Sequence, residues 1–493
     1  MTVTERELPV LLTGEPPVSS FRRWLAPATF LLFGLIDILV LGYFAHSGDA
    51  VFAFSQPFAK VTVPNLSLPG AVTCYVCGGV SIAIAVARAV LPFGKTPRRV
   101  AMAVVVFLLI IALLCWADAG LSTAFNIVNL LQGTLAGSIP IMLGALTGVI
   151  CSRSGVINVA IEGQLLAGAF TAAMVASVTG NIYLGLISGA LTGALVGALL
   201  AVFAIGYRVD QVVLGVVINT LILGLTGYLY DDLMVPNANT WNSPNTFNAF
   251  KIPLLGDIPI LGPVFFDSTI FLYLTYVALA AVQVGLFSTR WGLRTRAIGE
   301  HPVAADTVGI KVIAMRYRNV IAAGIIAGIG GSYFTVGSVG AFGKDMSSGE
   351  GYIALAAMIF GRYSPFGAVA AALLFGFTSQ LQSILSTINV PIQSNLLLMT
   401  PYIVTIIVLA GLVGKVRGPR AEGIPYVKSL CRTSRGARPA TLSTLAWPTP
   451  RCATLTQLVP GLATPGYAAP ALAVADLGSV LAVATAGSAL AGG

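Results

Sequence analysis

The sequence predicts an all-α polytopic membrane protein, a bundle of about 10–12 transmembrane helices. Of its 493 residues, 56% are hydrophobic and only 9% are charged, whereas soluble globular domains carry about 25% charged residues. The mean hydropathy is +0.89. Apolar runs of about 20 residues, which is long enough to cross a bilayer, recur along most of the chain. No soluble class of protein fits these three observations.

A polar segment opens the chain and leads into three expected spans. The first 20 residues are polar and partly acidic, and FRRWLAPATF then runs directly into an apolar stretch. This order is typical of a first spanning helix rather than of a cleavable signal peptide. We expect spans at 26–45, 71–92 and 100–121, and we assign residues 1–121 to an N-terminal extension. Asp37 lies within the first of these spans.

Eight further spans are expected after this extension, together with one apolar segment that is too short to cross. The segment 351–361 would extend only about 16 Å as a helix. We therefore expect it to be a half-helix or a re-entrant segment. The eight spans are expected at 134–151, 156–178, 182–206, 211–230, 268–288, 318–338, 364–387 and 395–414.

The distribution of Lys and Arg predicts the orientation of the chain, because cytoplasmic loops are enriched in these residues. Arg22 and Arg23 precede the first span, and a basic cluster that includes Lys415 follows the last one. The loop 289–319 is also strongly basic, whereas 231–267 contains one lysine. We therefore place both termini in the cytoplasm. The segment 418–493 is low in complexity, and we expect it to be a disordered cytoplasmic tail.

Glycines recur at four-residue spacing in two of the expected spans. Gly185, Gly189, Gly193 and Gly197 share one helical face, and Gly324 and Gly328 repeat the pattern. Such stripes let helix backbones approach closely in lipid, and we expect tight helix packing at these positions.

The sequence also argues against several functional classes. The basic residues lie between apolar runs, so the net charge of +9 does not indicate nucleic-acid binding. The chain has two histidines and no second CxxC pair, which argues against a metal site. The nearest match to a phosphate-binding loop, SVGAFGKD, lacks the first glycine and the final Ser or Thr. We find no motif of an enzyme and expect no cofactor bound by this chain.

The loop 289–319 is amphipathic in its middle. Glu300, Ala304, Ala305 and Val308 lie at helical spacing. A short helix parallel to the membrane fits this pattern. An ordinary basic loop at the lipid headgroups fits it equally well.

The stretch SGVINVAIEGQ places a carboxyl group in an apolar span. Ser154, Asn158 and Glu162 fall at i, i+4 and i+8, and we expect them on one helical face after a turn at Gly155. A buried carboxylate needs a hydrogen-bond or arginine partner. In one interpretation this polar face lines or gates a path through the membrane, and Glu162 couples the inner end of that path to a partner protein. In the other, Glu162 pins a broken helix by bonding freed backbone amides.

Four stretches together resemble one family of membrane proteins. They are SRSGVINVAIEGQLLAGAF, DQVVLGVVINTLILGLTGYL, RAIGEHPVAADTVGI and GEGYIALAAMIFGRYSPFGAVAAALLFG. The chain resembles the permeases of ABC importers for branched-chain amino acids, simple sugars and nucleosides, and is most similar to the nucleoside and simple-sugar branch. The resemblance implies a type II-like importer permease in a bacterial plasma membrane. Its permease core would occupy residues 122–417.

The resemblance also implies partners. Such a permease pairs with a second permease, as a homo- or heterodimer, and docks on two cytoplasmic ATPase domains that hold ATP and Mg. A substrate-binding protein or lipoprotein delivers the solute from outside. The segment that couples to the ATPase would contain Gly299, Glu300, Ala304, Ala305, Asp306 and Gly309.

For the path or gate we look to polar and aromatic residues within the spans, each of which has helix packing as its alternative role. Because few charges lie in the spans, a neutral solute such as a nucleoside or a sugar is favoured over an amino acid. A branched-chain amino acid importer and an ion-coupled secondary transporter are the alternatives. The candidate path residues are Asn158, Glu162, Gln164, Phe170, Asn219, Tyr333 and Gln380.

Overall fold

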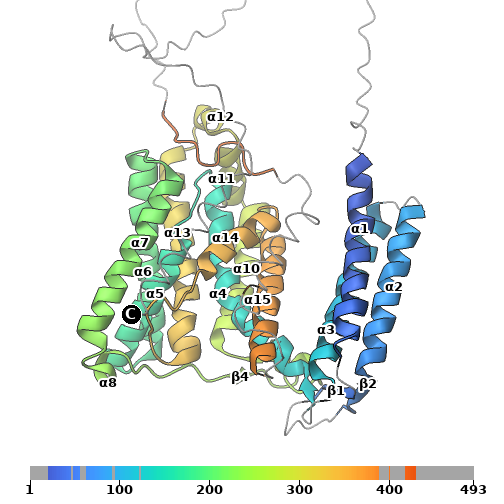
Figure 1. Ribbon diagram of the computed structural model, residues 1–493. Coiled ribbons are helices and arrows are strands. Elements are labelled where there is room, and N and C mark those ends of the chain that lie inside the picture. Colours follow the sequence, from blue (N-terminus) through green and yellow to red (C-terminus); the bar gives the residue numbers. More distant parts are fainter. Residues whose placement is uncertain are drawn as a thin grey trace, which may run out of the picture. The chain divides into compact units, whose positions relative to one another are not determined.

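The computed structural model describes residues 20–45, 48–55, 63–90, 95–120, 124–387, 399 and 417–428. Within these residues, nine helices are long and apolar enough to cross a membrane (Figure 1). The predicted all-α polytopic membrane fold is therefore confirmed. The expected span at 395–414 lies outside the described residues.

The first helices form a group of their own, which we call the N-terminal group. It consists of α1 (Ser20–Ile36), which continues as a π-helix η1 (Asp37–Gly42), followed by α2 (Gly70–Val90) and α3 (Lys95–Asp118). The apolar part of the first helix, Pro27–Gly42, is shorter than the expected span at 26–45. Three short strands at the end of this group, which the sequence did not predict, form a small sheet in the order β2-β1-β3. They are β1 (Asp49–Ala53), β2 (Leu66–Pro69) and β3 (Phe125–Asn126).

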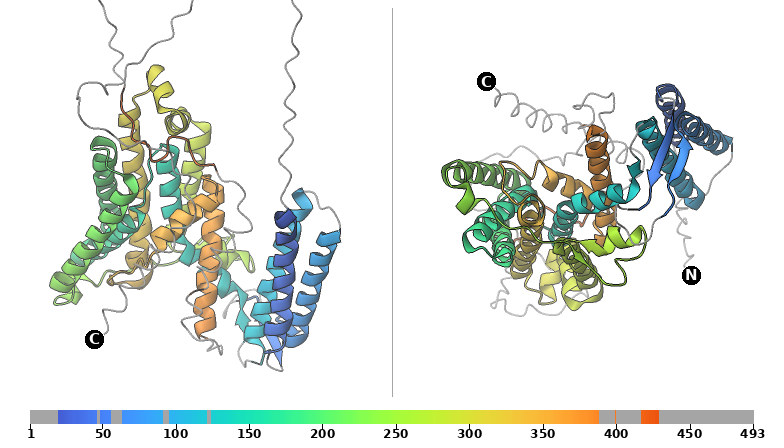
Figure 2. Two further views of the ribbon diagram at one scale, coloured as in Figure 1. Left: turned by 45° about the horizontal axis from the view of Figure 1, so that its top comes forward. Right: turned by 90° about the horizontal axis from the view of Figure 1, so that it is seen from below.

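The helices from α4 to α15 form the core of the molecule. Three of them, α4, α5 and α13, are mostly buried, whereas in the other spans of the core fewer than half of the residues are buried. In the right-hand view of Figure 2 the core helices are seen nearly end-on, standing side by side. The core spans are α4 (Ile127–Arg153), α5 (Ile161–Thr179), α6 (Ile182–Ala201) with η2 (Val202–Gly206), α7 (Gln211–Leu229) with η3 (Tyr230–Met234), α10 (Ile270–Ser288), α13 (Val312–Ser332) with η4 (Tyr333–Val339), and α15 (Pro365–Thr387).

Shorter elements connect these spans. The loop 231–267 contains the helices α8 (Ala238–Trp241) and α9 (Leu261–Phe266). Within it, strand β4 (Phe250–Lys251) pairs with β5 (Asp267–Ser268) at its end. On the way from α10 to α13 lie α11 (Arg290–Glu300) and α12 (Pro302–Thr307). The half-helix expected at 351–361 is confirmed as α14 (Glu350–Phe360), which packs against α4, α15 and α5 (Figure 1).

The glycine stripes lie where two helices pack closely, as their spacing predicts. A side chain at Gly193 would meet the backbone of Gly324 and Gly328, and one at Gly189 would meet Ser332. Helices α6 and α13 therefore pack with their backbones in close approach, as small-residue stripes allow in lipid.

One expected boundary is wrong in a way that matters for the site. The span expected at 318–338 begins at Val312, so Arg316 lies inside a helix rather than in a basic loop. Its side chain is only 1% exposed. Two backbone carbonyls accept hydrogen bonds from its guanidinium, which offsets the cost of burying this group.

Candidate functional site

The chain is not helical at the start of the stretch that carries Glu162. Helix α4 ends at Arg153, Gly155 adopts a left-handed conformation with φ of 83°, and α5 begins only at Ile161. The expectation that Ser154, Asn158 and Glu162 share one helical face is therefore wrong. The expected turn at Gly155 is confirmed, and it is followed by four residues, 156–159, without regular structure.

Side chains from α7 satisfy the backbone of this break. Gln211 Oε1 accepts a hydrogen bond of 2.7 Å from the amide of Ile157. Asn219 Nδ2 donates to the carbonyl of Val159 at 2.9 Å, and its Oδ1 accepts from the amide of Gly163 at 2.8 Å. Non-helical backbone is tolerated at membrane depth only when protein groups satisfy it. Asn219 thus supports the broken helix, and Gln211 is a second support that sequence reasoning missed.

Glu162 accepts three hydrogen bonds from the start of α14. Its Oε1 accepts from Ser347 Oγ at 2.6 Å and from the amide of Gly349 at 2.9 Å. Its Oε2 accepts from the amide of Gly351 at 2.6 Å. The carboxyl group lies in the first turn of α5, closer to the helix start than we expected, and its partners are a hydroxyl and two amides rather than an arginine. This is the geometry of the second interpretation, in which Glu162 pins a broken helix.

The start of α14 is shaped to receive this carboxyl group. Free amides at a helix N-terminus favour a negative partner. Gly349 caps α14 in a left-handed conformation, with φ of 83°. A side chain at Gly351 would lie within 2.5 Å of the backbone of Glu162, so only glycine permits this approach.

Tyr352 joins the same arrangement, because its hydroxyl accepts a hydrogen bond of 3.0 Å from Asn219 Nδ2. Helices α5, α7 and α14 are thereby linked through polar side chains. We call this set the α14 anchor, and it consists of Glu162, Asn219, Ser347, Gly349, Gly351 and Tyr352.

The structure places the other expected path residues in different surroundings. Asn158 Nδ2 donates to Gln164 Oε1 at 3.1 Å, and both side chains are buried. Phe170 packs edge-on against Phe342 with ring centroids 5.2 Å apart. Tyr333 packs against Phe271 in the same way at 5.5 Å.

Gln380 is not brought together with these residues. It lies on α15, where its amide is close to Gly133 of α4. The structure therefore places it between two helices and away from the α14 anchor.

Glu350 is a candidate that sequence reasoning missed. It is the first residue of α14, and its Oε2 is buried without a hydrogen-bond partner among the described residues. It lies near enough to Glu162 for their charges to interact. The signal was present in the string SSGEGY, where glycines flank an acidic residue at the start of an expected half-helix. Ser347 and Tyr352, the first and last residues of the same string, were also missed.

The expected coupling segment forms two helices instead of one. Glu300 ends α11, whereas Ala304, Ala305 and Asp306 belong to α12. The break falls at His301, which precedes Pro302 and has an extended backbone (φ −141°, ψ 82°). A residue before proline is disfavoured in the helical region, and this explains the break.

The segment ends in a left-handed turn, because Gly309 follows α12 with φ of 85°. Gly299 lies inside α11, against the carbonyl of Arg153 at the end of α4. Ala305 is buried against Ile298 and Val312. The side chains of Glu300 and Ala304 are exposed.

Residues 417–428, which we call the strap, pack against this segment. The amide of Ala421 donates to the carbonyl of Gly299 at 2.9 Å. Arg316 donates to the carbonyls of Ser154 and Ile424, both at 3.1 Å. Sequence composition had placed residues from 418 onward in a tail, but the described part of that tail is packed on α11 and α13. The remainder, 429–493, lies outside the described residues.

The strap also brings one carboxyl group to the end of α4. Burial raises the pKa of Glu422, while hydrogen bonds from Ser152 and Tyr363 and the nearby charge of Arg153 act in the opposite direction. The strap therefore contributes both backbone and side-chain contacts to this end of the core.

Comparison with known proteins gives a family match and several relatives. Residues 130–412 match the family model described as "Branched-chain amino acid transport system / permease component". The chain is 41% identical to the guanosine ABC transporter permease protein NupQ of Bacillus subtilis, over 61% of this chain and 96% of the relative. It is 38% identical to the nucleoside ABC transporter permease protein NupC of Lactococcus lactis, over 62% and 99%.

A more distant relative is named for a different substrate. The putative glucose ABC transporter permease protein TsgC13 of Haloferax volcanii is 30% identical over 54% of this chain and 80% of the relative. No solved structure matches the chain.

Proposed function

Because the chain belongs to the permease-component family of branched-chain amino acid transport systems, we propose that it forms the transmembrane path of an ATP-driven importer for nucleosides. The observation that carries this proposal is the similarity to guanosine and nucleoside permeases over nearly their whole length. The glucose permease is less similar, and a sugar is therefore the second candidate solute.

The surroundings of the buried charges support a neutral solute. The carboxyl group of Glu162 is bound to the start of α14, and the guanidinium of Arg316 donates to two backbone carbonyls. Both oxygens of Glu162 and two nitrogens of Arg316 are thus engaged within the protein, which argues against these two groups as the partners for the charged ends of an amino acid. Neutral polar groups and aromatic rings suit the hydrogen-bonding and stacking surfaces of a nucleoside. This argument favours a nucleoside or a sugar over a branched-chain amino acid.

We place the path beside the α14 anchor rather than through it. Every polar side chain of the anchor is engaged within the protein, which suits a positioning role for Glu162 and Asn219. Asn158 Oδ1, Gln164 Nε2 and Glu350 Oε2 are buried polar atoms without partners among the described residues. Buried polar atoms without partners are costly, and a passing solute with hydroxyl or amide groups can supply the missing bonds. We propose these three residues, with Phe170 and Tyr333, as path residues.

The power source in this proposal is a separate ATPase that holds ATP and Mg. We place two ATPase domains at α11 and α12, a second permease beside this one, and a binding protein or lipoprotein on the opposite face. Both chain ends lie in the cytoplasm of a bacterial cell. The exposed residues Glu300 and Ala304 would contact the ATPase, and the buried contacts of Gly299 with α4 would transmit its movement.

Reconstitution tests this function directly. The chain is placed in liposomes with a candidate ATPase, second permease and binding protein from the same organism, and uptake of radiolabelled guanosine, glucose and leucine is compared. We expect ATP-dependent guanosine uptake that excess uridine competes with more strongly than glucose does. Uptake driven by a proton or sodium gradient in liposomes that hold only this chain would contradict the proposal.

The coupling segment has its own test. Changing Glu300→Ala together with Gly309→Ala should abolish co-purification with the ATPase, because one contact is lost and the left-handed turn becomes strained. The matched control is Arg290→Ala, an exposed residue at the other end of α11. Equal co-purification of the double variant and the control would show that this segment does not bind the ATPase.

A further inference from the structure

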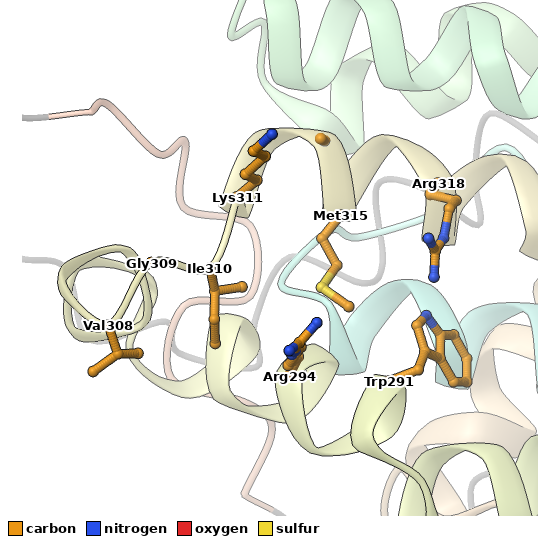
Figure 3. Close-up of a pocket in the computed structure, with 9 residues that line it drawn as sticks. Trp291, Arg294, Val308, Gly309, Ile310, Lys311, Met315 and Arg318 are labelled. Atoms are coloured by element: carbon orange, nitrogen blue, oxygen red, sulfur yellow. The ribbon is translucent and has the colours of Figure 1, made fainter.

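A pocket of about 500 Å³ opens between α11 and the first turns of α13. In Figure 3 the side chains of Arg294 and Met315 point toward one another across this space, as do those of Arg318 and Trp291. Lys311 lies where α13 begins. The pocket thus combines three cationic side chains with an apolar lining.

The three cations have no acidic partner within the described part of the chain. The salt bridges found there join Lys251 to Asp257 and Lys344 to Asp231, far along the chain from this pocket. No acidic side chain lines the pocket, and Arg294, Lys311 and Arg318 are all exposed. Grouped positive charge without a counter-charge attracts an anion.

The pocket lies at the ends of two spanning helices. Helix α10 ends at Ser288, three residues before Trp291, and Met315 and Arg318 lie in the first two turns of α13. Tryptophan is enriched at the membrane–water interface. The indole Nε1 of Trp291 donates to Asn319 Oδ1 at 2.9 Å, which fixes the ring in place.

The two spans that meet at the pocket also carry exposed apolar side chains. Val284 of α10 and Ile313 of α13 are exposed. A ligand held here can therefore place a charged group among the three cations and an acyl chain against the helices. A solvated basic loop would need neither the apolar lining nor the fixed indole ring.

We propose that this pocket binds the phosphate-bearing headgroup of an anionic phospholipid. Basic pockets between helices on the cytoplasmic side suit such headgroups, and each Lys or Arg near the surface contributes about 1 kcal/mol. The bound lipid would hold the loop after Gly309 against the membrane. This site is distinct from the α14 anchor and does not depend on which solute is transported.

The test uses the full chain, purified and placed in nanodiscs of phosphatidylcholine with or without phosphatidylglycerol. Lipids retained after transfer to detergent are counted by native mass spectrometry. We expect one tightly retained phosphatidylglycerol per chain. The triple variant Arg294→Gln, Lys311→Gln, Arg318→Gln should bind it roughly a hundredfold more weakly.

A second triple variant separates the pocket from the overall charge. Arg208→Gln, Arg290→Gln and Arg362→Gln removes the same charge from exposed residues that do not line the pocket. It should retain the lipid as the unchanged protein does. Changing Arg294→Lys with Arg318→Lys should preserve most binding, which shows that loss in the Gln variant is not misfolding.

Three results would overturn the proposal. The first is equal retention of phosphatidylglycerol by the pocket variant and the control. The second is retention of phosphatidylcholine as strongly as of phosphatidylglycerol. The third is displacement of the lipid by millimolar inorganic phosphate or glycerol 3-phosphate alone, which would identify a site for a soluble phosphate.

Discussion

Two of the buried carboxyl groups in the helices, those of Glu162 and Asp37, have completely different surroundings. Glu162 in the core accepts hydrogen bonds from Ser347 and from two backbone amides. Asp37, in the N-terminal group, is 0% exposed, and neither of its oxygens has a hydrogen-bond partner among the described residues. It lies in a π-helical turn against Gly78 of α2.

This difference separates a carboxyl group that organises structure from one that does not. The partners of Glu162 are the free amides of a half-helix, and without the carboxyl group those amides would themselves lie unpaired in the membrane. Among the described residues, no amide or hydroxyl group donates a hydrogen bond to Asp37. We therefore expect the same chemical change to have opposite effects in the two regions.

The largest effect is expected at Glu162. Changing Glu162→Ala removes both acceptor oxygens and leaves three donors without a partner, two of them buried and that of Gly349 half-buried. This costs about 3 kcal/mol. The midpoint temperature of thermal unfolding in detergent should fall by several degrees, and the rate of ATP-dependent uptake should fall at least tenfold.

Glu162→Gln is the matched variant, because it keeps the shape but turns one acceptor into a donor that faces another donor. It should preserve assembly better than it preserves transport. Wild-type stability and uptake in both variants would show that α14 does not depend on this side chain.

A smaller effect is expected at Asn219, which bonds the broken segment and Tyr352 from α7. Asn219→Ala should cost about 2 kcal/mol, since the carbonyl of Val159 and the amide of Gly163 lose their partner. Unfolding in detergent measures this change. Thr220→Ala, at an exposed neighbour on the same helix, should change nothing, and equal effects at the two positions would contradict the assignment.

The strap gives a third comparison, because the carbonyl of Ile424 accepts a hydrogen bond from the buried guanidinium of Arg316. Ending the chain after Lys428 keeps the strap, whereas ending it after Arg420 removes the carbonyl of Ile424 and the contact of Ala421 with Gly299. We expect the shorter chain to lose about 1–2 kcal/mol and to hydrolyse ATP with less uptake per ATP. ATPase activity and uptake measured together check this, and identical ratios for the two truncations would contradict it.

The smallest effect, with the opposite sign, is expected at Asp37. Asp37→Asn keeps the shape and removes a buried ionisable group, so stability should rise by up to about 1 kcal/mol. Uptake should stay unchanged. A loss of stability similar to that of Glu162→Ala would show that Asp37 has a structural partner and would end the contrast between the two regions.

The sequence predicted the spans well because long apolar runs have few alternatives in a membrane. It also predicted the half-helix α14 from its length. It singled out Glu162 and Asn219 from their polar character within apolar spans, and their role in a transport path stays a prediction. It could not predict the break before Ile161, because the residues that stabilise the break, Gln211 and Asn219, come from α7. Such contacts between distant segments leave no periodic signal.

Two other features were missed for local reasons. The proline after His301 divides the coupling segment into two helices, whereas the spacing of its residues fitted a single short helix and an ordinary loop equally well. The strap, like the segment that follows it, contains glycine and proline and no expected span, so the sequence placed both in one tail. Its packing becomes visible only once Arg316, which is buried inside α13, is seen to need carbonyl partners.

The most direct test of the central claim is a double-mutant cycle between Glu162 and Ser347, measured as the free energy of unfolding in detergent. Glu162→Ala, Ser347→Ala and the double variant are compared with the unchanged protein. If Glu162 holds the start of α14 as described, the two changes are non-additive by about 1.5 kcal/mol. Additive losses would contradict the account, because they would mean that the two residues do not act together.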